Sequence, residues 1–172
     1  MTGFNPFRLN VGFIAAEAVG YQREFDLAVA SMRLDDLEVR AVQGVATVSR
    51  TARGLLVQVH VEADTPQVCA RCLKPFHQHL VADFEELYAF NDKGLSEEGL
   101  RYPYTGILDL APLIREYFIL DIPISPVCSP DCKGLCPVCG ADRNETDCGH
   151  TTATTDPRWD ALRALLNPAG EA

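Results

Sequence analysis

Cysteine and histidine residues form close pairs along this chain of 172 residues, and these side chains are the ones best suited to bind a metal. The pairs are Cys69 with Cys72, Cys128 with Cys132, Cys136 with Cys139, and Cys148 with His150. Structural zinc takes four Cys or His ligands in tetrahedral geometry and leaves no position open for a substrate. The set therefore predicts two closed zinc sites that stabilise a fold.

The last two pairs predict one of these sites. A Cys-x-x-Cys turn directs two sulfurs toward one ion, and Gly140, directly after the turn, lets the backbone fold back beneath the metal. After a short loop, Cys148 and His150 supply two more ligands. We therefore expect zinc at Cys136, Cys139, Cys148 and His150.

The other site is less determined, because Cys69 and Cys72 need ligands from elsewhere in the chain. By elimination, Cys128 and Cys132 complete the site. This grouping requires the central Cys-x-x-Cys and the later pair to meet across more than fifty residues of sequence.

Other chemistry is possible for the same residues. A local site would join Cys69 and Cys72 to His77 and His79, since alternate residues of a strand point to one face; two solvent-facing histidines are the simpler interpretation. A redox pair needs an exposed thiol of low pKa beside a resolving thiol, and the sequence singles out no such pair. A catalytic zinc needs a nearby general base, but an acid such as Glu145 in a zinc loop is usually just solvated. We expect neither an enzyme nor a small-molecule substrate.

Composition is that of an ordinary soluble domain, with 47% hydrophobic and 23% charged residues. The sequence shows no apolar run of the roughly 20 residues that cross a bilayer. The N-terminus lacks the basic start and apolar core of a signal peptide. We therefore expect a cytoplasmic protein without a membrane partner, in a compartment where thiols stay reduced.

Charge is unevenly distributed over the chain, whose formal net charge is −9. Residues 81–127 hold nine acidic and three basic residues, a net charge of −6. Such a surface repels a phosphate backbone. A direct contact with RNA is therefore expected only at the basic turn that carries Arg71 and Lys74.

Hydrophobic patterning predicts a β-rich first half. Strands are expected at residues 8–14, 24–30, 37–49, 55–63 and 77–84. The run 55–63 alternates apolar and polar residues with the period of two that is typical of a half-buried strand, and Thr51 to Gly54 is a plausible hairpin connection before it. Residues 91–106 are expected to form a loop.

Two helices are expected after this loop. Asp109 is the predicted N-cap of the first, with Pro112 in its first turn and Pro123 beyond its end. Its apolar stripe comprises Leu110, Leu113, Ile114, Tyr117 and Phe118. Asp156 is the predicted cap of the second helix.

These expectations define an α+β fold, a mainly antiparallel β domain with a few helices and a C-terminal zinc-binding cysteine cluster. Residues 1–126 are predicted to be the β-rich domain, with the central Cys-x-x-Cys turn and one helix. Residues 127–150 form a zinc module packed on it, and residues 151–172 a last helix and tail.

The segment 128–140, Cys-Ser-Pro-Asp-Cys-Lys-Gly-Leu-Cys-Pro-Val-Cys-Gly, resembles the YceD family of large ribosomal RNA subunit accumulation proteins. Residues 68–73, 107–123 and 156–165 resemble the same family, so the likeness extends from about residue 50 to 166. The chain departs from the family in two places. Cys148-Gly149-His150 stands where Cys-x-Cys is more frequent, and Arg143-Asn144 stands where Leu-Asn is common.

The resemblance implies a ribosome biogenesis factor that supports accumulation of 23S ribosomal RNA and assembly of the large subunit. The implied partner is the pre-50S particle with its 23S RNA, and the acidic residues 81–127 indicate a basic ribosomal protein as a second possible contact. Two functions from other classes remain as alternatives: a zinc-stabilised adaptor or regulator of protein contacts unrelated to ribosomes, and a zinc enzyme. The oligomeric state is not predicted.

Overall fold

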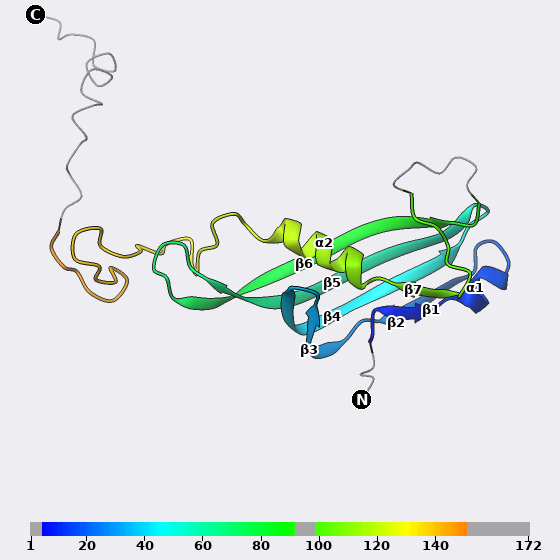
Figure 1. Cartoon of the computed structure of the whole chain (residues 1–172), viewed down its shortest axis with the longest axis horizontal. Coiled ribbons are helices and arrows are strands. Elements are labelled where there is room, and N and C mark those ends of the chain that lie inside the picture. The colour runs from blue at the N-terminus through cyan, green and yellow to red at the C-terminus, as the bar shows by residue number, and fades with distance from the viewer. Residues whose placement is uncertain (1–4, 92–98, 151–172) are drawn as a thin grey trace, which may run out of the picture.

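The computed structural model describes residues 5–91 and 99–150. This part of the chain is mainly antiparallel β-structure (Figure 1). Its elements are β1 (Arg8–Asn10), α1 (Gly12–Ala16), β2 (Gln22–Asp26), β3 (Val29–Leu34), β4 (Leu37–Arg50), β5 (Gly54–Val68), β6 (Pro75–Ala89), β7 (Ile107–Asp109) and α2 (Ala111–Asp121). The predicted α+β class is confirmed.

A five-stranded sheet organises the described residues. β4, β5 and β6 are its long strands, while β2 and β3 both pair with β4 along different parts of its length. The pairing of β4 with β5 shifts register between Arg40 and Gln43, where Ala41 has a φ of 49°. β1 and β7 form a separate two-stranded sheet.

Alternation along the strands produces a core on one face of the sheet. On β5, Val57, Val59 and Val61 are buried while the residues between them are exposed. α2 covers this face with Ile114 and Phe118, both fully buried. The predicted apolar stripe of this helix is therefore its packing face.

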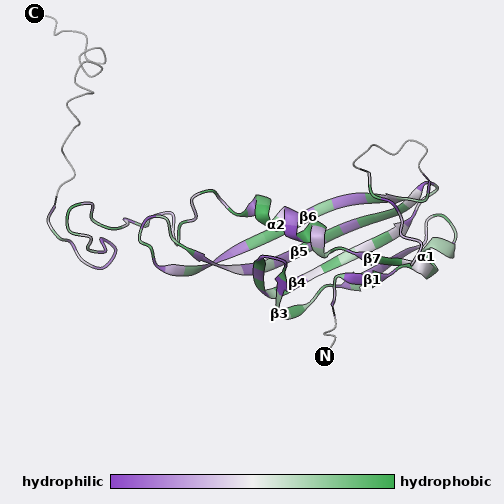
Figure 2. Ribbon diagram, in the orientation of Figure 1, coloured by the Kyte–Doolittle hydropathy of each residue, from purple (hydrophilic) through white to green (hydrophobic). Residues whose placement is uncertain are grey.

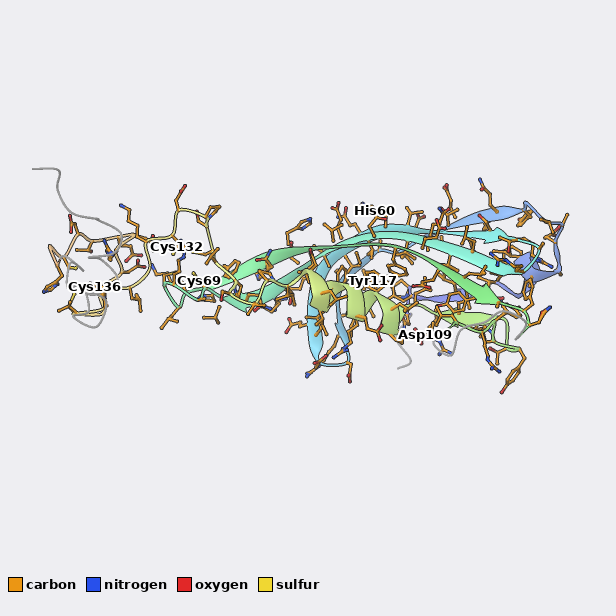
Figure 3. The ribbon with its side chains drawn as sticks, turned by 90° about the horizontal axis from the view of Figure 1, so that it is seen from above. His60, Cys69, Asp109, Tyr117, Cys132 and Cys136 are labelled. Carbon is orange, nitrogen blue, oxygen red and sulfur yellow. The ribbon has the colours of Figure 1, made fainter. Side chains whose placement is uncertain are left out.

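Two further observations fix which face α2 covers. The rings of Phe84 on β6 and Tyr117 on α2 stack with centroids 4.4 Å apart. His60 projects from the opposite face of the sheet (Figure 3). The sheet therefore has one packed face and one polar face, and Figure 2 shows the alternating hydropathy along its strands.

Three local predictions were wrong. Residues 8–14 are not one strand, because β1 ends at Asn10 and the chain turns into the short helix α1, which the prediction of one helix missed. Residues 24–30 are split into β2 and β3, because Leu27 is buried between them and its N–H donates to the carbonyl of Gly44 at 2.8 Å. The N-cap of α2 is Leu110 rather than Asp109, whose carboxylate instead accepts the N–H of Ala111 at 3.1 Å.

The other predicted strands lie within β4, β5 and β6, which extend beyond the predicted ends. Thr51 closes the predicted hairpin, since its hydroxyl oxygen lies 3.1 Å from the backbone nitrogen of Gly54. The predicted helix from Asp156 lies outside the described residues. In the residues that are described, helices are too short or too polar to cross a bilayer.

Candidate metal centre

The β5–β6 hairpin positions the first Cys-x-x-Cys at its tip. The two strands pair from Gly54 opposite Ala89 to Val68 opposite Pro75, so residues 69–74 form the connection between them. Within this connection, the N–H of Cys69 donates to the carbonyl of Lys74 at 2.9 Å. The tip and the segment after α2 lie beyond one end of the sheet (Figure 1).

The hairpin cluster comprises Cys69, Cys72, Cys128 and Cys132, whose sulfurs all lie within 4.8 Å of one another. The sulfur of Cys69 is 3.8 Å from that of Cys132, and the sulfur of Cys72 is 3.7 Å from that of Cys128. These separations exceed the roughly 2.05 Å of a disulfide. They match the edges of a tetrahedron about an ion with bonds of about 2.3 Å, the length of a zinc–thiolate bond.

Backbone contacts explain how residues distant in sequence meet in this cluster. After α2, Pro126 accepts the N–H of Ala70 at 2.7 Å, which holds the chain against the hairpin tip just before Cys128. Cys69 is fully buried and Cys132 nearly so, with Phe76 and Val127 packed beside them. Figure 3 shows Cys69 and Cys132 close together beyond the end of the sheet.

The alternative grouping of Cys69 and Cys72 with His77 and His79 is not formed. Both histidines are exposed on β6. Nδ1 of His79 lies 3.1 Å from a carboxylate oxygen of Asp64 on the neighbouring strand. The structure therefore places these histidines on the strand surface, away from the sulfurs.

The C-terminal cluster comprises Cys136, Cys139, Cys148 and His150, whose ligand atoms also lie within 4.8 Å of one another. The N–H of Gly140 donates to the carbonyl of Cys136 at 2.9 Å, and Gly140 has a φ of 74°. This left-handed conformation favours glycine, because a Cβ there crowds the following carbonyl. The chain therefore turns back after Cys139, as the sequence predicted.

The environment of the thiols favours ionisation at one cysteine in each cluster. At Cys69, burial opposes ionisation, but the backbone N–H groups of Cys128, Cys72 and Arg71 lower the pKa to about 6. At Cys136, the backbone N–H of Cys139 lowers the pKa to about 6. The thiolate is the form that binds a metal, so each cluster holds a group ready for coordination near neutral pH.

A neighbouring thiol has the opposite effect at Cys128. Its hydrogen bond with Cys72 raises the pKa of Cys128 to about 12. The protonated thiol is therefore favoured while sulfurs share the site with no cation. A bound divalent cation reverses this preference. The donor set and its spacing fit such a cation at both clusters.

Arg71 and Lys74, the predicted RNA contacts, are bonded within the protein. A guanidinium nitrogen of Arg71 donates to the carbonyls of Cys132 at 2.9 Å and Pro130 at 3.2 Å. Lys74 lies 2.7 Å from the carboxylate of Asp142 and also pairs with Glu145. These two carboxylates raise the pKa of Lys74 above its ordinary range, with Asp142 the larger cause.

The sequence analysis missed Asp142 and Asn144. Asn144 donates from its side-chain amide to the sulfur of Cys132 at 3.4 Å. Asp142 accepts from Lys74, and this ion pair, with Asn144 beside it, lowers the pKa of Asp142. Asp142 contacts Lys74 of the hairpin, which is distant in sequence, and Asn144 contacts Cys132 twelve residues earlier, so no turn or strand spacing indicates either contact.

Comparison with known proteins identifies a family for the part of the chain that carries both clusters. The family model described as large ribosomal RNA subunit accumulation protein YceD matches residues 57–166, which include all eight residues of the two clusters. No solved structure matches the chain.

Individual relatives extend the match toward the N-terminus. An uncharacterized protein of Mycobacterium tuberculosis (strain ATCC 25618 / H37Rv) is 34% identical over 84% of this chain and 68% of its own length. An uncharacterized protein of Mycobacterium leprae (strain TN) is 30% identical over 70% of this chain and 57% of its own length. The chloroplastic YCED homolog 1 of Zea mays, named a large ribosomal RNA subunit accumulation protein, is 41% identical over 30% of this chain and 16% of its own length. The chain therefore belongs to the YceD family of large ribosomal RNA subunit accumulation proteins.

Proposed function

We propose that this protein supports the accumulation of 23S ribosomal RNA by binding to the assembling large ribosomal subunit, without catalysing a reaction. The family match over residues 57–166 is the observation that carries this proposal. Family membership implies the association with the large subunit, and the pre-50S particle is the proposed partner.

Zinc is the metal proposed for both clusters, one ion in each. Soft thiolates select zinc among the common divalent cations of the cell, and imidazole suits it equally. Four protein ligands fill a tetrahedral zinc ion and leave no position for an activated water. Structural zinc therefore agrees with a binding role better than with hydrolysis. Elemental analysis of protein purified without chelator should give two zinc ions per chain.

A basic ribosomal protein is the proposed direct contact, in preference to bare RNA. The polar face of the sheet carries carboxylates on three strands, in adjoining rows of the strand register. They are Glu24, Asp26, Glu62, Asp64, Asp83 and Glu85. A phosphate backbone is repelled by this face, whereas a lysine- or arginine-rich protein surface is complementary to it. The internal bonds of Arg71 and Lys74 leave these cations less free to meet phosphate.

Depletion of the protein tests the ribosomal role. The expected result is a lower ratio of 23S to 16S RNA and accumulation of an incomplete large subunit in a sucrose gradient. The tagged protein should sediment with that incomplete particle. An unchanged RNA ratio, with the protein remaining at the top of the gradient, would contradict the proposal and favour a protein adaptor unrelated to ribosomes.

A charge-reversal variant tests the proposed contact. Glu85→Lys should weaken sedimentation with the particle, since this side chain is exposed on the polar face. Glu116→Lys, on the exposed side of α2, is the matched control and should leave sedimentation unchanged. Equal effects of the two variants would indicate a response to net charge alone and not a specific surface.

A further inference from the structure

The loop between Cys139 and Cys148 belongs to the C-terminal cluster in sequence, yet it contacts the hairpin cluster. The amide of Asn144 donates from Nδ2 to the sulfur of Cys132 at 3.4 Å. Oδ1 of the same amide accepts the backbone N–H of Lys133 at 2.8 Å. Both contacts are made to the segment that carries a ligand of the other cluster.

Asp142 fixes the orientation of this amide. One carboxylate oxygen of Asp142 accepts both the backbone N–H and the side-chain N–H of Asn144, each at 2.8 Å. The other oxygen lies 2.7 Å from Nζ of Lys74, which comes from the hairpin connection. Asp142 has only 12% of its side chain exposed. The loop is thus attached to both chain segments that supply the hairpin cluster, the hairpin connection and the segment that carries Cys132.

Backbone bonds hold the same segments together. The N–H of Leu135 donates to the carbonyl of Arg71 at 3.0 Å, and the N–H of Arg143 donates to the carbonyl of Gly134 at 3.0 Å. Arg71 lies between Cys69 and Cys72, so the chain that enters the C-terminal cluster is hydrogen-bonded to the turn that supplies the hairpin cluster. The two clusters therefore share one hydrogen-bonded framework.

We propose that Asn144 is a positioning residue through which the C-terminal cluster controls metal retention at the hairpin cluster. An N–H donor to a thiolate stabilises the charged form that the metal requires, and outer contacts of this kind change metal affinity by about 10- to 100-fold. The loop has few apolar residues of its own, so metal at Cys136, Cys139, Cys148 and His150 is what holds it in place. Loss of that metal releases Asn144 from Cys132.

This coupling is reciprocal, because each site changes the affinity of the other by the same factor. It rests on metal binding by both clusters and is independent of the ribosomal role. Cobalt is a suitable probe, since the four-sulfur hairpin cluster and the three-sulfur, one-nitrogen C-terminal cluster give different absorption spectra in tetrahedral coordination.

The experiment titrates cobalt into the full-length, metal-free, reduced chain. Asn144→Ala should weaken binding at the four-sulfur site by about 10- to 100-fold while the capacity stays at two ions. Arg143→Ala is the matched control: it changes the neighbouring side chain but retains the backbone bond to Gly134, so its titration should match the original protein.

Cys148→Ser separates coupling from a purely local bond. It leaves all four hairpin ligands intact, yet it should weaken the four-sulfur site by a similar factor, because the loop loses its own metal. Wild-type cobalt affinity at the four-sulfur site in Cys148→Ser overturns the coupling, even if Asn144→Ala binds cobalt weakly at that site. Should the original chain take up no cobalt, both this coupling and the zinc assignment fail, whereas the ribosomal role stands or falls on the sedimentation result.

Discussion

The sheet and the cysteine end of this molecule are stabilised in different ways. The sheet shares one large group of buried apolar side chains with α1, α2 and β1. At the cysteine end, defined as residues 69–74 and 127–150, the buried group is Cys69, Cys72 and Cys132 with Phe76 and Val127 alongside. The buried residues of the first region form a hydrophobic core, whereas those of the second are mainly cysteines of the hairpin cluster.

The contrast indicates that two regions of one chain depend on different sources of stability. Burial of apolar area is therefore expected to drive the sheet to fold without help from a metal. A segment of about thirty residues rarely buries enough apolar surface to fold alone, and metals commonly compensate. The ion pairs and hydrogen bonds at the cysteine end orient the residues of the two clusters, each of which could hold a metal ion.

Removal of a ligand from the C-terminal cluster should have the largest effect on the cysteine end. Cys136→Ser is expected to unfold residues 127–150 locally and leave the sheet folded, since structural zinc supplies roughly 10 kcal/mol or more of apparent binding energy in small zinc domains. Limited proteolysis followed by mass spectrometry should find new cleavage near residue 140. Chelation of the original protein should reproduce this pattern.

Cooperative loss of the sheet in Cys136→Ser would contradict the division into two regions. Circular dichroism in the far ultraviolet distinguishes the outcomes, because it reports the strands directly. A retained β-sheet spectrum with a new cleavage site is the expected combination.

A cavity in the core should affect the sheet without affecting the metal. Phe118 of α2 is fully buried. Its replacement by alanine should lower the free energy of unfolding by about 3–5 kcal/mol. Leu120→Ala is the matched control, because Leu120 lies on the same helix with 81% of its surface exposed. Denaturant unfolding gives the stabilities, and elemental analysis should find unchanged zinc in the folded variant.

Gly134 offers a smaller test at the cysteine end. It has a φ of 70°, and a Cβ there would lie 2.9 Å from the carbonyl oxygen of Arg71. Gly134→Ala should cost about 1–2 kcal/mol of local stability through the left-handed backbone alone, and more through that contact. Gly140→Ala has similar backbone strain, at a φ of 74°, but meets nothing within 4 Å.

The difference between these two alanine variants isolates the contact with Arg71. Amide hydrogen exchange over residues 127–150 should be faster in Gly134→Ala than in Gly140→Ala. Equal exchange in the two variants would mean that the turn at Arg71 moves to accommodate the new Cβ without a measurable loss of local stability.

The smallest expected effect on stability comes from removing an exposed ion pair between α2 and the β3–β4 connection. Nη2 of Arg115 on α2 lies 2.6 Å from Asp36, which is in the β3–β4 connection and 66% exposed. The hydrogen bond from Arg115 lowers the pKa of Asp36. A carboxyl with a lowered pKa stabilises the fold above its ordinary pKa, and this contribution is lost as pH falls through the lowered value.

Asp36→Asn should therefore be slightly less stable than the original protein at pH 7, and the two should converge in acid. Solvent screening keeps the difference small. Chemical denaturation at pH 7 and at about pH 3 measures it. A difference that grows as the pH falls would contradict the direction of the pKa shift.

The sequence alone determined the candidate metal ligands and most of the sheet. Alternation in residues 55–63 and the ligand spacing at Cys136 and Cys139 act over short distances, where side-chain period and turn geometry leave few options. The prediction of one strand at residues 24–30 was wrong for a non-local reason. The N–H of Leu27, a buried residue, donates to the carbonyl of Gly44 and divides this segment, and no property of residues 24–30 indicates that contact.

Only the tertiary structure decided which residues complete the hairpin cluster, for which the sequence left two groupings open. Hairpin pairing carries Cys69 and Cys72 to the far end of the sheet, and the bond from Ala70 to Pro126 brings Cys128 to meet them. The roles of Lys74 and Asn144 also depend on the path of the chain, since Lys74 contacts Asp142 in a distant segment and Asn144 contacts Cys132 twelve residues earlier. Spacing along the chain therefore indicates which cysteines form a pair. The pairing of β5 with β6 and the path of the chain after α2 determine which pairs meet.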